Sequence, residues 1–296
     1  MIVRISAILI MALMMIQVTG YAQADSLGPD NSPAKPAFES GYLIDQQTTN
    51  GYIKNTLEFV IHHRFGSVKN EAKDLYGIYG ASNIRFGLNY SFTKNLLLGV
   101  GTTKNKKFQD VSVKYSILKQ TKSLSIPVSV SFFESFGMDG RPNSAFGTQY
   151  KFSDRFSYFS QLIISHRFND MLSFQVAPSF THYNSADTLM DHDKVGISFA
   201  GRVKFSPQSS FIFGVDLPMK IKSIREYHAL SANQSKPNIS FGVDVETSAH
   251  AFQIFISTAQ GIVPQEIMAK NNLLGSDKLL ISQFMLGFNI TRLWNF

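Results

Sequence analysis

Large apolar side chains alternate with small or polar ones along most of the chain from residue 55 onward. In the stretch 83–93 every second position is apolar, namely Ile84, Phe86, Leu88, Tyr90 and Phe92. The positions between them are polar or glycine. An extended chain points successive side chains to opposite faces, so this period of two predicts β-strands with one apolar and one polar face.

The same pattern recurs in twelve segments of about ten residues, each of which we predict to be a strand. The predicted strands are 55–65, 83–93, 96–103, 110–120, 126–136, 155–168, 172–182, 195–205, 211–217, 238–247, 251–261 and 281–296.

The connections between these segments alternate in length. Those at 94–95, 121–125, 169–170, 207–209 and 248–250 are tight. Those at 66–82, 137–154, 183–194, 219–237 and 262–280 are long, and 104–109 is a shorter member of the same set. In a β-sandwich, short and long connections have no reason to alternate. This alternation is typical of an all-β, antiparallel, up-and-down transmembrane β-barrel with short periplasmic turns and long extracellular loops.

A transmembrane barrel assigns a different environment to each face of its strands. We expect the apolar faces to contact lipid and the polar faces to line a wet lumen. Lys119, Glu134 and Arg292 carry charge in the apolar phase, and we expect each to lie close to a turn, a loop or the terminus, where a long side chain reaches the interface. Pro178 falls mid-strand and predicts a β-bulge, because proline donates no ladder hydrogen bond.

The first 24 residues have the pattern of a cleaved signal peptide. Arg4 precedes an apolar run over 5–18, followed by Ala22-Gln23-Ala24 as a small-x-small cleavage site. The run is shorter than the ~20 residues of a spanning helix. We therefore predict export to the outer membrane, with 1–24 removed, 25–54 as a flexible periplasmic segment or a plug that enters the barrel, and 55–296 as the barrel.

Composition narrows the possible chemistry. The 296 residues include no Cys, which excludes disulfides, thiolate metal sites and covalently attached haem, and no cofactor is predicted. The formal net charge of +7 falls to +6 without Arg4. The basic residues are scattered in an exported chain, so no nucleic-acid partner is predicted. The predicted partners are the lipid bilayer of the outer membrane and, during assembly, the barrel-insertion machinery.

Several short motifs give the chain a family resemblance. They are His63-Arg64-Phe65-Gly66, Lys114-Tyr115 with Gln120, Phe156-Ser157-Tyr158 with His166-Arg167, and Pro178-Ser179 with His182 and Asn184. From about residue 40 to the end, the chain resembles an uncharacterised Bacteroidota outer-membrane β-barrel family known only as a domain of unknown function. The resemblance implies an outer-membrane barrel and supplies no catalytic residues.

The last predicted strand is expected to close the barrel against 55–65. Phe288, Ile290, Trp294 and Phe296 fall on one face of it. This arrangement resembles the C-terminal recognition signal of outer-membrane proteins, through which the insertion machinery engages a new chain. Arg292 departs from that pattern.

Charged residues in the polar phase form two predicted groups. Arg64 and Arg85 are expected in the lumen near the outer rim, where they would give a weak anion preference. Arg202 and Lys204 are expected near the periplasmic end, one strand removed from Asp244 and Glu246, and could form an ion-pair constriction. The alternative is that these charges only fill a wet interior and pair there.

Two further chemistries have candidate residues. Asp191, His192 and Asp193 have ligand types that suit a divalent metal, but acidic residues are common in external loops and the motif is weak. His63 and His182 are expected at the outer rim in the lipid-facing phase, where a lipid hydrolase would need a His. Such an enzyme also needs a Ser and an orienting group on that face, and the sequence identifies neither, so we predict no enzyme.

Two functional classes remain open. One is a narrow channel or facilitator for small polar solutes, which we favour. The other is a non-conducting structural or docking barrel of the cell envelope, closed by charge pairs, by the loop 137–154 or by the segment before Lys54. A lipid hydrolase is a remote third class. Twelve strands lie between side-chain-filled and water-filled barrels, so barrel size does not decide.

Overall fold

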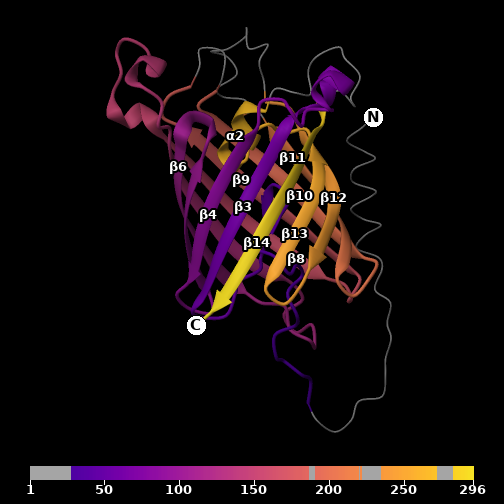
Figure 1. The fold of residues 1–296 in the computed structure, drawn as a ribbon. Helices are drawn as coiled ribbons and strands as arrows, with labels where there is room; N and C mark the ends of the chain where they lie inside the picture. The colour runs from indigo at the N-terminus through magenta and orange to yellow at the C-terminus, as the bar shows by residue number, and fades with distance from the viewer. Residues whose placement is uncertain (1–27, 187–190, 220, 222–234, 272–282) are drawn as a thin grey trace, which may run out of the picture.

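The protein forms a closed antiparallel barrel of twelve strands (Figure 1). The computed structural model describes residues 28–186, 191–219, 221, 235–271 and 283–296, so the predicted signal peptide lies outside the described residues. Strands adjacent in the chain pair with each other, and the last pairs with the first. The barrel strands are β3 (Thr56–Ser67), β4 (Asn83–Ser91), β5 (Leu96–Thr103), β6 (Phe108–Leu118), β7 (Ser129–Met138), β8 (Phe156–Arg167), β9 (Leu172–Tyr183), β10 (Asp193–Lys204), β11 (Ser209–Met219), β12 (Asn238–Glu246), β13 (His250–Ser257) and β14 (Met285–Asn295).

The predicted alternation explains why these segments are strands. Along β3, buried and partly exposed residues alternate at every position. The buried phase points into the barrel, and the exposed phase carries large apolar side chains such as Phe86, Val111 and Ile254. A continuous exposed apolar belt is what a lipid-facing surface requires. The predicted fold class and all twelve predicted strands are confirmed, with boundaries that shift by a few residues.

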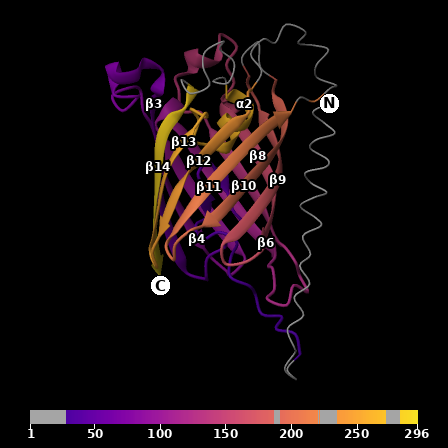
Figure 2. The ribbon, with the colours of Figure 1, turned by 90° about the vertical axis from the view of Figure 1, so that its right-hand side faces the viewer.

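The two ends of the barrel differ. Figures 1 and 2 show the short turns gathered at the end where the C-terminus lies, and the long connections at the other end. In a bacterial barrel of this topology the short turns face the periplasm and the long loops face outward. We use these names for the two ends below.

The segment before β3 enters the lumen from the periplasmic end. Its strands β1 (Tyr42–Leu43) and β2 (Gln46–Gln47) form a small antiparallel hairpin. Residues 37–50 are buried throughout except Glu39. We call residues 37–52 the hairpin plug. The hairpin plug therefore lies inside the barrel. Residues 30–34 lie against the turn at 121–125, where the Ala34 amide donates to the Gln120 carbonyl at 2.7 Å.

The extracellular end carries a second inward element. Helix α2 (Pro264–Lys270) belongs to the connection between β13 and β14, and its residues from Gln265 to Ala269 are buried. It packs against β8, β9, β10 and β11, and Figure 1 shows it at the barrel mouth. No helix among the described residues is long and apolar enough to cross a membrane.

Two local predictions are wrong. Glu134 does not lie near a strand end: β7 starts at Ser129 and extends to Met138, which puts Glu134 in its middle. The predicted segment 126–136 was displaced toward the turn. Pro178 causes no bulge, because β9 pairs with β10 in unbroken register with Pro178 opposite Ile197. Register shifts occur instead between Ser116 and Leu118 and between Met285 and Gly287.

Candidate functional site

The tip of the hairpin plug binds the lumenal wall through a buried ion pair. The Asp45 carboxylate pairs with the Arg64 guanidinium, and their side chains are 0% and 1% exposed. The other Asp45 oxygen accepts hydrogen bonds from Asn238 at 3.0 Å and Ser257 at 2.8 Å. Arg64 also lies over the Phe255 ring, 4.3 Å from its centroid. Since β3, β12 and β13 present these residues near their extracellular ends, the plug reaches almost through the barrel.

Along the sides of the plug, side chains of the barrel wall form hydrogen bonds with the plug backbone. Asn289 donates to the Ile44 carbonyl at 2.8 Å, and Gln175 donates to the Gln47 carbonyl at 2.8 Å. Gln46 of the plug donates in turn to the Phe199 carbonyl at 3.1 Å. One apolar contact accompanies them, a buried cluster of Ala37, Phe38, Leu43, Ile44, Ala200, Ile212 and Phe255. The plug is therefore attached to the wall by individual contacts and adds no strand to the barrel.

The return arm of the plug is anchored lower in the barrel. The hydroxyls of Thr49 and Ser165 lie 2.5 Å apart. The Tyr52 hydroxyl donates to the Glu58 carboxylate, which also accepts from Asn89 at 2.6 Å. Lys114 donates to the Thr48 carbonyl at 3.2 Å. The plug thus enters at the periplasmic end, turns near the outer end and returns.

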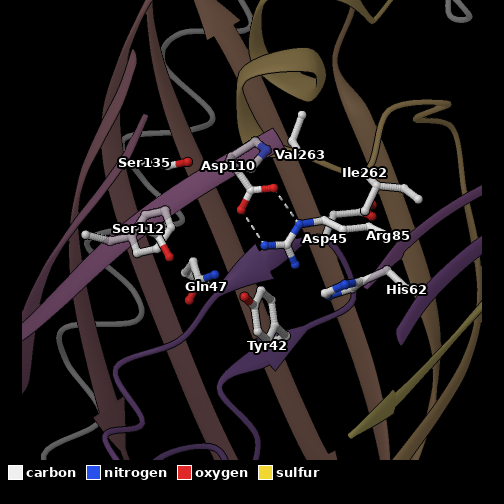
Figure 3. Close-up of a pocket in the computed structure, with 12 residues that line it drawn as sticks. Tyr42, Asp45, Gln47, His62, Arg85, Asp110, Ser112, Ser135, Ile262 and Val263 are labelled. Carbon is white, nitrogen blue, oxygen red and sulfur yellow. Dashed lines mark hydrogen bonds and ion pairs between the residues drawn. The ribbon is translucent and has the colours of Figure 1, made fainter. Parts of the chain in front are cut away.

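Arg85 forms the centre of a small lumenal pocket (Figure 3). Its Nε and Nη2 donate to the two Asp110 oxygens at 2.9 and 2.5 Å, a bidentate pair. Arg85 is on β4 and Asp110 on β6, so the guanidinium crosses β5 at Gly101. A Cβ at Gly101 would collide with the guanidinium, which explains the glycine there.

This pocket lies where the plug meets the extracellular loop. Figure 3 shows Tyr42 and Gln47 of the plug on one side of the Arg85–Asp110 pair, and Ile262 and Val263 on the other. Its cavity volume is about 20 Å³, and a neighbouring cavity beside Met268 holds about 10 Å³. A water molecule needs roughly 10–15 Å³ by this measure. These two cavities each have room for about one water, so plug and loop pack closely around them.

Helix α2 is held in the mouth by apolar and polar contacts. Met268 packs into a buried cluster with Phe133, Phe159, Ile163 and Ala177, all of them lumenal. Gln265 donates to the Ser135 hydroxyl at 3.1 Å. Glu266 pairs with Lys106 at 2.8 Å. The lumenal face is therefore not uniformly polar, and its apolar patch is the docking surface of α2.

The periplasmic group of predicted charges is brought together around Arg202. Its Nη1 lies 3.4 Å from Glu39 of the plug and 3.7 Å from Glu246, and the Arg202 side chain is 1% exposed. Asp244, also buried, lies on the same strand and face as Glu246. Lys204 points into the barrel beyond Arg202 and forms no ion pair within the described residues. The plug residue Glu39 thus joins Arg202 at the point where the plug enters.

The sequence indicated Glu246 as a neighbour of Arg202, and the two lie 3.7 Å apart, but it did not indicate the partners of Arg64 and Arg85. Arg64 and Arg85 lie in the lumen toward the outer end as expected, and each is neutralised by a carboxylate, Asp45 or Asp110. Asp45 lies in a two-residue turn of the plug, where no alternating pattern of polar and apolar residues could have predicted its direction. Asp110 lies at an inward-facing position of β6. The alternation of polar and apolar residues along that strand was the one sequence signal that could have identified Asp110 as a lumenal residue.

The histidine and metal candidates are engaged locally. Asp191 pairs with Lys194 at 2.6 Å, and the His192 Nδ1 lies 2.7 Å from the Tyr183 carbonyl. Asp193 lies 2.7 Å from Nδ1 of His182, whose Nε2 lies 3.1 Å from Asn184. His63 stacks on Phe288, with ring centroids 4.8 Å apart. No group of three metal-ligating side chains occurs in the described part of the chain.

Strand β14 closes the barrel as predicted. It pairs with β3 from Met285 to Asn295, opposite Ser67 to Thr56. Phe288, Ile290 and Trp294 lie in its outward phase, and Phe296 follows with its amide donating to the Asn55 carbonyl at 3.1 Å. Arg292 shares this face near the periplasmic end, beside His250.

A family comparison agrees with this architecture. The sequence model of a family described as "Membrane bound beta barrel domain (DUF5777)" matches residues 38–294, which covers all but one residue of the plug and all but the last residue of the barrel strands. The chain belongs to this family. With its lipid-compatible outer belt and up-and-down topology, this member is an outer-membrane β-barrel protein.

Solved structures with a similar fold are barrels as well. The NanC porin is 14% identical, with a TM-score of 0.48, and the match covers 81% of this chain and 99% of that one. An outer-membrane channel from Pseudomonas putida F1 is 10% identical, with a TM-score of 0.47 over 82% of this chain and 96% of that one. The KdgM porin is 9% identical, with a TM-score of 0.43 over 80% and 98%. A search of curated proteins gave no match.

Proposed function

We propose that this protein is a channel for small polar solutes whose lumen is closed by the hairpin plug. The observation that carries the proposal is the chemistry of the contact between plug and wall. Apart from the cluster around Phe38 and the edge-to-face contact of Tyr42 with His62, the described plug is attached by separate hydrogen bonds and ion pairs, each of which water can replace.

The wall behind the plug supports the same conclusion. It is lined by Ser, Thr, Asn and Gln with paired charges, including Ser165, Gln175, Asn238, Ser257 and Asn289. Such side chains stay solvated when the plug withdraws, whereas a wall built as an apolar core would be exposed at a large cost. A polar lumen of this size suits small hydrophilic solutes.

A reversible covalent lock tests the proposal, because the native chain has no Cys. The Thr49 and Ser165 oxygens, 2.5 Å apart, are close to the ~2.05 Å separation of two disulfide sulfurs. The double variant Thr49→Cys/Ser165→Cys is reconstituted in planar bilayers. We expect it to be silent when oxidised and to conduct after reduction, because only the reduced plug can leave.

The single variants Thr49→Cys and Ser165→Cys are the matched controls, and redox treatment should not change their conductance. Deletion of residues 37–52 should give a permanently conducting barrel. Equal conductance of the oxidised and reduced double variant would show that the plug is not the gate. Silence of every form, including the deletion, would favour the second functional class.

That second class is a non-conducting barrel that serves as a structural or docking element. One observation favours it: α2 occupies part of the extracellular mouth, against β8 to β11 and beside plug residues Gln46 and Gln47. In this class α2 would keep the lumen closed even after the plug is removed. We keep this class as the alternative.

We also propose that the protein is not an enzyme. The support comes from His182, whose two ring nitrogens are both occupied, by Asp193 and Asn184. A catalytic histidine in a lipid hydrolase needs one nitrogen directed at a serine. For assembly, we propose that the insertion machinery recognises β14 through Phe288, Ile290, Trp294 and Phe296. Deletion of Phe296 should then lower the amount of folded protein in the outer membrane, and full yield would exclude this role.

A further inference from the structure

The outer surface of the described strands carries one polar pair at mid-depth, Glu134 on β7 and Ser160 on β8. The Ser160 hydroxyl donates to a Glu134 oxygen at 2.5 Å. Among the described residues, Ser160 alone forms a hydrogen bond with the Glu134 side chain. Directly above and below this pair, the register partners on the two strands are Phe136 with Tyr158 and Phe132 with Leu162. All four are exposed. We call these six residues the β7–β8 strip.

The depth of Glu134 makes its carboxyl costly in lipid. A tilted barrel strand rises about 2.5 Å per residue along the barrel axis. Glu134 is five residues from Ser129 and four from Met138, so it lies roughly 10–12 Å from either end of β7. A glutamate side chain is too short to reach the interface from there. Other charged side chains on the outward face of the described strands, such as Asp193 and Arg292, lie nearer the rims.

The pair satisfies only part of the hydrogen-bonding capacity of the carboxyl. One oxygen accepts from Ser160, and the other accepts from no described residue. Acyl chains offer neither donors nor acceptors, and the hydrocarbon region excludes water. An ionisable residue in this position is expected to have a specific partner in the bilayer.

The chain itself supplies a partner of matching chemistry. Two copies in one bilayer that are related by a twofold axis along the membrane normal present every residue at equal depth. Glu134 of one copy then faces the polar pair of the other at the same level. The strip is self-complementary, because each copy offers a serine hydroxyl, which can donate and accept, and a carboxyl oxygen, which can accept. On either side of this pair, the side chains of Phe136 with Tyr158 and of Phe132 with Leu162 provide an apolar packing surface that excludes lipid.

We propose that the β7–β8 strip is the interface of a homodimer in the membrane, with the two Glu134–Ser160 pairs hydrogen-bonded across the twofold axis. The occupant of this face is a second copy of the chain. The lumen of each barrel is unaffected, so this inference is independent of whether the barrel conducts.

Photo-crosslinking in intact outer membranes tests the interface. Leu162 is replaced by p-benzoyl-phenylalanine, which reacts with C–H bonds in an apolar environment. The matched control carries the same probe at Ile254, which is exposed on β13, five strands away from β8 around the barrel. We expect a crosslinked product of twice the chain mass from position 162 and none from 254. Equal yields at both positions, or a product with another protein, would overturn the proposal.

Two substitutions in the Leu162 probe background then test the polar pair. Glu134→Leu should abolish the dimer product, and Glu134→Gln, which still donates and accepts, should retain it. Heat-modifiable migration on gels checks that each variant is folded. As a measurement that needs no variant, single-molecule photobleaching of the labelled wild-type protein in lipid bilayers should show two-step traces. One-step traces throughout would also overturn the proposal.

Discussion

At the scale of single residues, the Asp45–Arg64 pair is the contact on which the plug depends most. Both side chains are fully buried, and Asp45 also accepts hydrogen bonds from Asn238 and Ser257. Removing one partner of a buried pair costs about 3–5 kcal/mol, because the other charge is left uncompensated. Asp45→Ala should therefore reduce the hydrogen-exchange protection of the plug amides by about two orders of magnitude or more, while the barrel strands keep theirs.

The control for this prediction is Asp30→Ala. Hydrogen bonds from Ser32, and then from Lys122, lower the pKa of the Asp30 carboxyl to about 2. The Asp30–Lys122 pair at 3.1 Å is nevertheless exposed on both sides, and such pairs contribute little. Asp30→Ala should leave the protection of the plug unchanged. Unchanged protection in Asp45→Ala would mean that the plug is held mainly by the Phe38 cluster.

Alternation along the strands predicts the direction of a side chain but not its partner. That is why Arg64, Arg85, Arg202 and Glu246 could be assigned to the lumen from the sequence. The partner of Arg85 lies two strands away, and the contact depends on the missing side chain at Gly101. The partner of Arg64 lies in the plug. Such lateral and long-range contacts have no periodic signal.

At the scale of elements, α2 is the second segment packed inside the barrel. Met268 is its main apolar anchor, 2% exposed among lumenal side chains. Truncating a buried Met to Ala costs about 2–5 kcal/mol. Met268→Ala should therefore loosen α2, and trypsin added outside intact cells should cleave faster after Lys270, detected as a new terminus at Asn271.

Met171→Ala is the matched control for this experiment. Met171 lies in a periplasmic turn and is 60% exposed, so its truncation should leave cleavage after Lys270 unchanged. If Met268→Ala is cleaved no faster than the control, the Glu266–Lys106 pair at 2.8 Å would hold the helix without its apolar anchor.

The elements inside the barrel are also where sequence interpretation was least informative. The plug is short and polar, and it lacks the period of two that marks the strands, because its contacts are individual side-chain bonds. Helix α2 has only seven residues, too few for a helical period to be evident. Strand ends were shifted for a similar reason. The alternating pattern fades into the turn before β7, so Glu134 was assigned to a strand end when it lies at mid-depth.

At the scale of the whole molecule, the topology could be predicted because it depends on repetition. Twelve alternating segments and the parity of their connections specify an up-and-down barrel, and the long final strand specifies the closing partner. What fills the lumen does not follow from that repetition. A barrel of this size has space for water or for protein, and the N-terminal segment decides between them.

The closed barrel then predicts the selectivity of the open one. Withdrawal of the plug removes Asp45 from Arg64 and Glu39 from Arg202. Glu246 remains beside Arg202, but Arg64 has no other carboxylate partner within the described wall. An unpaired guanidinium in a narrow lumen attracts anions. The barrel lacking residues 37–52 should therefore show a reversal potential in a salt gradient that indicates anion preference.

Arg64→Gln in the same deletion background should abolish this preference, because it removes the charge that the plug leaves exposed. Arg85→Gln should shift the reversal potential in the same direction but by a different amount, since it frees Asp110 from its bidentate partner and leaves Arg64 unpaired. The two substitutions remove the same formal charge from neighbouring strands. Equal shifts would show that selectivity follows the total lumenal charge and not the pairing that the closed structure describes.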